Sequence, residues 1–254
     1  MKLRVLGCSG GIGARARTTS FLVDDDILID AGTGVEDLSI DELTRIDHVF
    51  LTHSHLDHVL ALPLLVDSVG ARRGRPIVVH ALPETIAALR AHVFNWVIWP
   101  DFTEIPHYER PWMTFEPMQL GATVSIGERS IRSIPANHTV PAVGFHVWGP
   151  QGALVFSGDS WPTDEFWRVV NGIRHLRFLI IETAFSNKER DLAITAKHLY
   201  PIELGEQLKS LRKEAEVLIT HLKPSDADTI AREIDAWAGR SMPRLLERGM
   251  VLEF

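Results

Sequence analysis

Short apolar runs, broken by turn residues, alternate with longer amphipathic stretches in the first third of the chain. Residues 3–6, 20–23, 27–30, 48–51 and 77–80 have the length and composition of strands. Residues 62–69 and 84–93 carry the spacing of helices. Three consecutive acids, Asp24, Asp25 and Asp26, separate the second and third runs and predict a solvated hairpin turn.

Short apolar runs in the middle of the chain predict strands joined as hairpins, at residues 113–116, 123–126, 130–135, 143–148 and 153–156. The last third alternates again, with helices expected at 163–170, 201–211 and 226–237 and strands at 178–181 and 217–220. No internal repeat or low-complexity linker interrupts this order. We therefore expect an α/β protein with one domain over residues 1–254 and an aromatic-rich insertion around 93–112.

Composition narrows the class of protein. The 254 residues are 45% hydrophobic and 23% charged, as in ordinary globular proteins. A net charge of −7 argues against broad nucleic-acid binding, which favours a basic surface. A single cysteine, Cys8, excludes an internal disulfide and is typical of a reducing compartment, so a cytoplasmic location is expected. No apolar run approaches the ~20 residues of a membrane span, and no signal peptide is expected.

A dense group of metal-binding residue types follows the apolar run 49–51: His53, His55, Asp57 and His58. His53 and His55 are two apart, so in extended chain they point the same way and can bind one ion. Asp57 and His58 come where the strand gives way to a turn, which can direct them to a second ion. Imidazole and carboxylate suit zinc, and also manganese or iron. A histidine-rich surface turn is the structural alternative.

Three more residues of the same types each stand just past a strand-like run. His138 follows residues 131–134, Asp159 follows 153–156 and His221 follows the run that ends at 220. Each alone would be interpreted as a capping histidine or a turn aspartate. Their joint occurrence at strand ends favours metal ligation. His48, His80 and His146 have no such pattern around them, and we expect them to be structural or exposed.

The H-x-H-x-D-H motif after a strand, followed by His, Asp and His in that order, resembles the metallo-β-lactamase superfamily along nearly the whole chain. This resemblance implies a four-layer αββα sandwich. It also implies two divalent metal ions, with zinc as the expected metal. The implied ligands are His53, His55 and His138 for the first ion, Asp57, His58 and His221 for the second, and Asp159 as a bridge between them.

Three further stretches resemble the class II cyclic-nucleotide phosphodiesterases: Glu-Thr-x-Phe-x-Asn at 182–187, His-Leu-x-Pro at 198–201 and Thr-His-x-Lys-Pro at 220–224. The resemblance implies that a small phosphodiester, a 3′,5′-cyclic nucleotide with cyclic AMP preferred, is hydrolysed to the 5′-monophosphate. A hydroxide generated on the metals, held also by Asp57, would attack phosphorus. His198 would protonate the departing oxygen while Glu182 orients it.

Other interpretations stay open. The arrangement of Glu182 and His198 also resembles the tRNA 3′-processing endonucleases, but no basic glycine- and proline-rich arm is visible, so nucleic acid is not the expected partner. A metal-bearing nucleotide sensor or scaffold without turnover is a third hypothesis. Trp96, Trp99 and Phe102 could stack on a base or contact a second subunit in a homodimer. The glycines of the first loop predict a flexible loop near the metals rather than a dinucleotide cradle.

Overall fold

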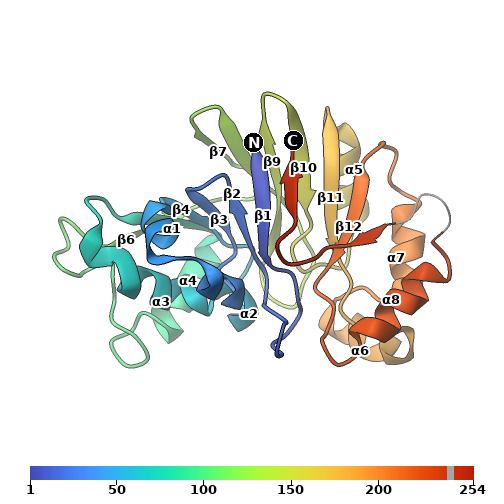
Figure 1. The fold of residues 1–254 in the computed structure, drawn as a ribbon, viewed down its shortest axis with the longest axis horizontal. Coiled ribbons are helices and arrows are strands. Elements are labelled where there is room, and N and C mark those ends of the chain that lie inside the picture. Colours follow the sequence, from blue (N-terminus) through green and yellow to red (C-terminus); the bar gives the residue numbers. More distant parts are fainter. Residues whose placement is uncertain (239–242) are drawn as a thin grey trace.

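Two β-sheets lie face to face with helices on their outer sides (Figure 1). The computed structural model describes residues 1–238 and 243–254. Within these ranges each sheet has seven strands, and the two sheets follow one another along the chain except for the carboxyl-terminal strand, which returns to the first sheet. The amino and carboxyl termini consequently lie side by side, paired through β1 and β14.

The first sheet combines an antiparallel half with a parallel half. Its order is β14 (Val251–Glu253), β1 (Lys2–Gly7), β2 (Ser20–Val23), β3 (Ile27–Ile29), β4 (His48–Phe50), β5 (Ile77–Ala81) and β6 (Met113–Pro117). Strands β2 and β3 form the hairpin expected at the three acids, and Asp24 adopts φ 49° in its turn. The parallel strands β3 to β6 all point their carboxyl ends to the same edge.

The second sheet is also mixed, with β7 to β10 antiparallel and β10 to β13 parallel. Its order is β13 (Arg244–Leu245), β12 (Glu216–Thr220), β11 (Leu176–Glu182), β10 (Gly152–Phe156), β9 (Val143–Gly149), β8 (Arg129–Pro135) and β7 (Thr123–Ile126). Strands β10 and β11 are mostly apolar because both of their faces are covered.

The helices connect these strands and cover their outer faces. They are α1 (Ile40–Arg45), α2 (Leu56–Val59), α3 (Ala61–Val69), α4 (Pro83–His92), α5 (Asp164–Gly172), α6 (Arg190–Ala196), α7 (Pro201–Leu208) and α8 (Ala227–Asp235), with 3₁₀ turns at Thr33–Asp37, Gly70–Arg72 and Asn187–Glu189. Pro201 occupies the first turn of α7, where its missing N–H costs no hydrogen bond. Within the described ranges, no helix is long and apolar enough to cross a membrane.

Three apolar layers hold the architecture together. Between the sheets, Phe21 packs edge-on against Phe156 with ring centroids 5.0 Å apart, and Phe50 packs against Phe145 at 5.9 Å. A second layer lies between the first sheet and helices α3 and α4, and a third between the second sheet and helices α5, α7 and α8. The predicted four-layer αββα sandwich is confirmed, while the single domain over residues 1–254 stays a prediction.

The sequence prediction was wrong about one strand pairing and missed several short elements. Residues 113–116 were expected in a hairpin-like run, but β6 is an edge strand that pairs in parallel with β5. The short elements α1, α6, β13 and β14 were not predicted. Helix α1 begins at a capping box in which Ser39 and Glu42 bond reciprocally, a local signal that the short apolar pattern around it concealed.

Candidate metal centre

The candidate ligands come from both sheets and meet at the edge to which the parallel strands point. His53, His55, Asp57 and His58 follow β4 of the first sheet. His138, Asp159 and His221 follow β8, β10 and β12 of the second sheet. Loops at the carboxyl ends of strands, and the first residues of the short helix α2 for Asp57 and His58, position these side chains on a two-sheet base.

One cluster joins His53, His55 and His138, each with a ring nitrogen within 4.8 Å of the others. Nε2 of His138 lies 3.2 Å from Nδ1 of His55. His53 is fully buried, and His138 is nearly so. Three imidazole nitrogens that converge in this way could hold one divalent ion.

A second cluster joins Asp57, His58, Asp159 and His221, again with donor atoms within 4.8 Å. Oδ2 of Asp159 lies 3.1 Å from Nε2 of His58 and 3.3 Å from Nε2 of His221. The same oxygen lies 3.8 Å from Nε2 of His53 in the first cluster. Asp159 thus stands between the two clusters, where the sequence placed a bridging ligand, and its bridging role stays a prediction.

Two buried atoms test whether the residues fit a pair of ions. Nε2 of His53 and Oδ1 of Asp159 are buried and have no hydrogen-bond partner among the described residues. A buried polar atom without a partner costs about 1–3 kcal/mol, so a folded protein rarely leaves two of them together. Cations beside these atoms would remove both penalties, and the donor set of imidazoles and carboxylates fits divalent ions such as zinc.

The protonation states of four candidate ligands, His53, His138, His221 and Asp159, also suit metal binding. Burial lowers the pKa of His138 to about 4 and that of His221 to about 3, and it lowers the pKa of His53 well below its usual value. Burial alone would raise the pKa of Asp159, but the nearby His221 and His58 outweigh it and hold that pKa well below its usual value. Neutral imidazoles and an ionised carboxylate are the forms that bind metal ions.

His58 is oriented by Asp30, which sequence reasoning did not identify as a site residue. Nδ1 of His58 lies 2.7 Å from Oδ2 of Asp30, and Oδ1 of Asp30 accepts the Thr52 N–H at 2.8 Å. Burial opposes a charge on His58, but Asp159 and Asp30 raise its pKa well above the usual value. The hydrogen bond to Asp30 leaves Nε2 facing the cluster, as outer carboxylates do for ligand histidines. The available signal was an acid at the end of the apolar run 27–29.

Glu182 and His198 form a buried pair beside the two clusters. Nδ1 of His198 donates to Oε1 of Glu182 at 2.8 Å, and the same oxygen accepts the Ser160 N–H at 3.2 Å. Burial disfavours the imidazolium, but Glu182 outweighs it and raises the pKa of His198. The His198 ring offers a nitrogen within 4.8 Å of donor atoms of His138 and Asp159. Since Nδ1 is engaged by Glu182, Nε2 is the atom free for chemistry.

Two lysines stabilise the loops that carry the ligands, and neither was predicted. Nζ of Lys197 donates to Oδ1 of Asn137 at 3.0 Å and to the carbonyl oxygen of His138 at 2.9 Å. Nζ of Lys223 donates to the carbonyl oxygen of Gly10 in the first loop. A Cβ at Gly10 would lie 2.4 Å from the His221 carbonyl oxygen, so only glycine allows this loop to lie against the ligand.

Comparison with known proteins agrees with this geometry. Residues 25–222 match the model of the Beta-lactamase superfamily domain. A probable 3′,5′-cyclic-nucleotide phosphodiesterase of Yersinia pestis is 26% identical, over 87% of this chain and 77% of its own length. A ribonuclease Z of Crocosphaera subtropica is 30% identical, over 58% of this chain and 47% of its own length.

Solved structures share the fold. The unliganded yeast phosphodiesterase PDE1 superimposes with a TM-score of 0.81 and 18% identity, over 100% of this chain and 99% of its own. The metallo-β-lactamase fold protein YhfI of Bacillus subtilis gives a TM-score of 0.77 and 20% identity, over 99% of both chains. With the family match over most of the chain and this architecture, the protein belongs to the metallo-β-lactamase superfamily.

Proposed function

We propose that the protein is a dinuclear metal-dependent phosphodiesterase that hydrolyses a 3′,5′-cyclic nucleotide, with cyclic AMP as the preferred substrate, to the 5′-monophosphate. The observation that carries this proposal is the Glu182–His198 pair, bonded at 2.8 Å beside two clusters of metal-binding side chains. A proton donor next to a paired-cation site suits a reaction in which an alkoxide leaves a phosphoryl group.

The residues have distinct roles in this proposal. Two divalent ions would be held by His53, His55 and His138, by Asp57, His58 and His221, and by Asp159 between them, and they would activate water and neutralise phosphoryl charge. Stabilisation of the phosphoryl charge by the two ions would be strongest where the site excludes water. His53 and His58 are fully buried, so water is excluded on their side of the site.

The chain's own side chains would handle the protons. Oδ2 of Asp57 lies 3.8 Å from Nε2 of His58 and 3.7 Å from Nε2 of His221, where this partly exposed carboxylate would take one proton from the attacking water. The new P–O bond forms to that water oxygen as the bond from phosphorus to the 3′-oxygen breaks. Nε2 of His198 gives its proton to the 3′-oxygen, and Glu182 keeps the ring oriented through Nδ1.

The choice of a small cyclic substrate rests on likeness and on charge. The phosphodiesterase relatives match 87% of this chain, whereas the ribonuclease Z relatives match a little over half. The net charge of −7 also disfavours a polyanion such as RNA. The finer assignment to cyclic AMP depends on the phosphodiesterase likeness alone.

One assay tests the proposal. Purified protein loaded with zinc or manganese is given cyclic AMP, cyclic GMP, bis(p-nitrophenyl) phosphate and a tRNA precursor, and products are separated by chromatography. Conversion of cyclic AMP to 5′-AMP, with slower or no cleavage of the tRNA precursor, supports the proposal. Cleavage of the tRNA precursor alone would identify an endonuclease instead. Two bound metal ions without turnover of any of the four substrates would favour a binding scaffold.

A further inference from the structure

Six exposed apolar side chains gather on one face near the metal motif, and we call them the apolar patch. Its members are Leu56 of α2, Leu60 between α2 and α3, Leu64 of α3, and Trp96, Val97 and Ile98 from the loop after α4. Their exposed fractions range from 46% at Leu60 and Leu64 to 84% at Val97. Exposed apolar residues scattered singly need no explanation, but a contiguous group marks an interaction site.

A groove of about 230 Å³ runs through this patch. Leu56, Leu60 and Leu64 recur at helical spacing along one wall, and Ile98 and Trp99 form the other. The metal-facing side chains Asp57 and His58 project from the same short helix in other directions. The groove therefore borders the metal motif without being part of it.

The loop beside the groove is held in one conformation. Oδ1 of Asn95 accepts the N–H groups of Val97 at 3.0 Å and Ile98 at 2.8 Å, and the Trp96 N–H donates to the Trp99 carbonyl at 3.0 Å. Trp96 adopts φ 62°, a left-handed conformation that costs a bulky residue about 1–3 kcal/mol. A protein keeps such strain where the displayed side chains have a use.

The lining of the groove disfavours a nucleobase as its occupant. Its walls are apolar side chains, and the sole polar side-chain atom in its lining is Nε1 of Trp99, which is buried and has no partner within the described part of the chain. A base brings several donors and acceptors that such walls would leave unpaired, at about 1–3 kcal/mol each. Apolar side chains are a better match.

The patch offers both a projecting loop and a groove, which is the combination that a two-fold interface requires. In such an interface the same surface serves both partners, so each loop can enter the other copy's groove. The six side chains expose on the order of 500 Å² of largely apolar surface, near the upper end for a single patch on a monomer. A standard interface buries about 800 Å² per partner, so this patch would supply most of one.

We propose that the apolar patch is the interface of a two-fold homodimer in which Val97 and Ile98 of one copy fill the groove of the other. The dimer would place the two metal centres beside a shared apolar seam. This proposal is independent of the substrate and would hold for any chemistry at the metals.

The oligomeric state of the intact protein tests it. Sedimentation at 1–50 μM (roughly the range for a nM to μM interface) should give twice the chain mass of 28.5 kDa. The double variant Val97→Asp, Ile98→Asp should raise the dimer dissociation constant at least ~100-fold, because each carboxylate would be buried unpaired. Metal content and circular dichroism should not change. The matched control Ile202→Asp changes a side chain that is 58% exposed on α7 and should remain dimeric.

Two results would overturn the proposal. A wild-type protein that is monomeric throughout the range has no such interface. A double variant that is still dimeric associates through another surface. If that dimeric double variant also has a higher KM for cyclic AMP than the wild type, the loop contacts substrate rather than a second copy.

Cysteine crosslinking tests the register of the two copies. The only native cysteine, Cys8, donates to the Leu246 carbonyl oxygen, and burial raises its pKa to about 11, so it reacts slowly near neutral pH. Copies carrying Ile98→Cys are mixed with copies carrying Leu60→Cys and mildly oxidised. The proposed interface predicts disulfides between the two kinds of copy. A dimer that forms without this crosslink has a different interface.

Discussion

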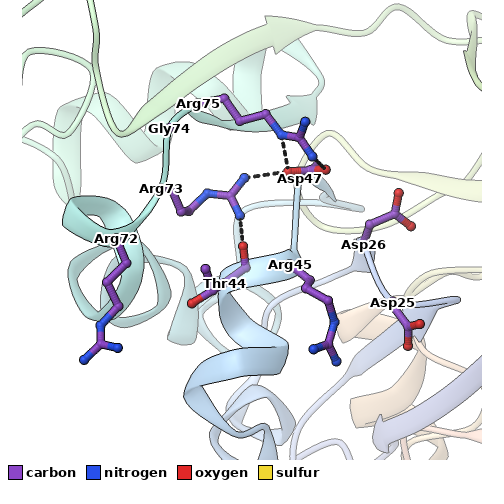
Figure 2. A pocket seen from close by; sticks show the side chains of 9 residues that line it. All are labelled: Asp25, Asp26, Thr44, Arg45, Asp47, Arg72, Arg73, Gly74 and Arg75. Carbon is purple, nitrogen blue, oxygen red and sulfur yellow. Dashed lines mark hydrogen bonds and ion pairs between the residues drawn. The ribbon is translucent and has the colours of Figure 1, made fainter.

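The two ends of strand β4 differ in whether their charged and polar side chains have hydrogen-bond partners. At its amino end, Asp47 accepts hydrogen bonds from Nη2 of Arg73 at 2.6 Å and from Nε of Arg75 at 2.8 Å (Figure 2). At its carboxyl end, His53 begins the candidate metal centre, where Nε2 of His53 and Oδ1 of Asp159 have no partner among the described residues. Five residues, 48–52, separate the paired carboxylate of Asp47 from His53, whose buried Nε2 has no partner among the described residues.

The amino-end cluster is self-contained. Figure 2 shows Arg73 and Arg75 directed at Asp47, with Arg73 also donating to the Thr44 carbonyl oxygen, while Arg72 points away. Burial raises the pKa of Asp47, but Arg75 and Arg73 outweigh it and the net shift is downward. Opposite charges paired here need no external ion. Nε of Arg73 is buried without a partner among the described residues, but both carboxylate oxygens of Asp47 are paired. An unpaired buried carboxylate oxygen beside an unpaired imidazole nitrogen, rather than charge density, therefore identifies the candidate functional edge.

Removal of Asp159 should have the largest effect. Asp159→Ala, like His55→Ala, should reduce bound metal from about two ions per chain and abolish phosphodiester hydrolysis, because each takes away a ligand of the proposed centre. Metal content is measured by elemental analysis after dialysis, and turnover by product formation. Full activity in either variant would contradict the ligand assignment.

Asp47 should matter for stability and not for metal binding. Asp47→Asn leaves Arg73, whose side chain is 4% exposed, without its carboxylate, and should lower the free energy of unfolding by about 3 kcal/mol. The control Asp25→Asn alters an exposed neighbour in the same hollow and should change stability by less than about 0.5 kcal/mol. Urea unfolding gives both values. Loss of metal from the Asp47 variant would show that the two edges are not independent.

His198 tests the chemistry next to the metals. His198→Ala should keep both metal ions and slow hydrolysis by about 100-fold, the usual contribution of a general acid. The exposed His107→Ala is the matched control and should react at the wild-type rate. An unchanged rate in His198→Ala would remove the residue from the mechanism.

Lys197 connects the loop of one candidate ligand to the rest of the site. Lys197→Met should weaken metal binding by about tenfold, since it frees the backbone of His138 and the side chain of Asn137. Competition with a chromogenic chelator measures this affinity. Lys209→Met, on an exposed lysine that bonds only Glu206, provides the comparison, and equal affinities in the two variants would refute a positioning role.

His80 gives the smallest expected effect, as a pH dependence of stability. It is buried beside Phe50, and its Nε2 lies 3.0 Å from Nδ1 of His48. Burial lowers its pKa to about 4, whereas the unfolded chain titrates near ~6.5. Below pH 6.5 the unfolded chain therefore binds the proton first, and stability falls with falling pH until about pH 4. Between pH 6.5 and 5.5 the loss from this group is at most about 1.4 kcal/mol.

The variant His80→Gln isolates that contribution. Its free energy of unfolding should decline less steeply than that of the wild type over the same pH interval and run parallel to it above pH 7. Urea unfolding at a series of pH values supplies the measurement. If the free energy of unfolding falls with pH at the same slope in both proteins, His80 has the same pKa in the folded and the unfolded chain.

The sequence predicted most of the strands and the candidate ligands because both have local signals. The six-residue motif after β4 and the polar residues after β8, β10 and β12 stand beside apolar runs that are visible without a structure. The four-layer architecture came from resemblance, since periodicity does not say which strands become neighbours. The parallel pairing of β5 and β6 illustrates this, because it joins segments separated by α4 and the aromatic loop.

The hydrogen bonds that hold the candidate ligands in place could not be predicted either, because a sequence pattern does not say which distant residues become neighbours. Asp30 orients His58 across 28 residues, and Lys197 reaches His138 across 59. Neither residue belongs to a periodic pattern or a short motif, so only the folded arrangement reveals its partner. Of the aromatic insertion, Phe102 proved to be a core residue and Trp96 an exposed one, a difference that the composition of the segment does not contain.

The most direct test of the account is anomalous diffraction from crystals of the protein grown with zinc. Two peaks about 3.5–4 Å apart are expected. One should lie against His53, His55 and His138, the other against Asp57, His58 and His221, with Asp159 touching both. An absence of peaks at this edge, or peaks bound by other side chains, would contradict the paired-cation centre on which the proposed activity depends.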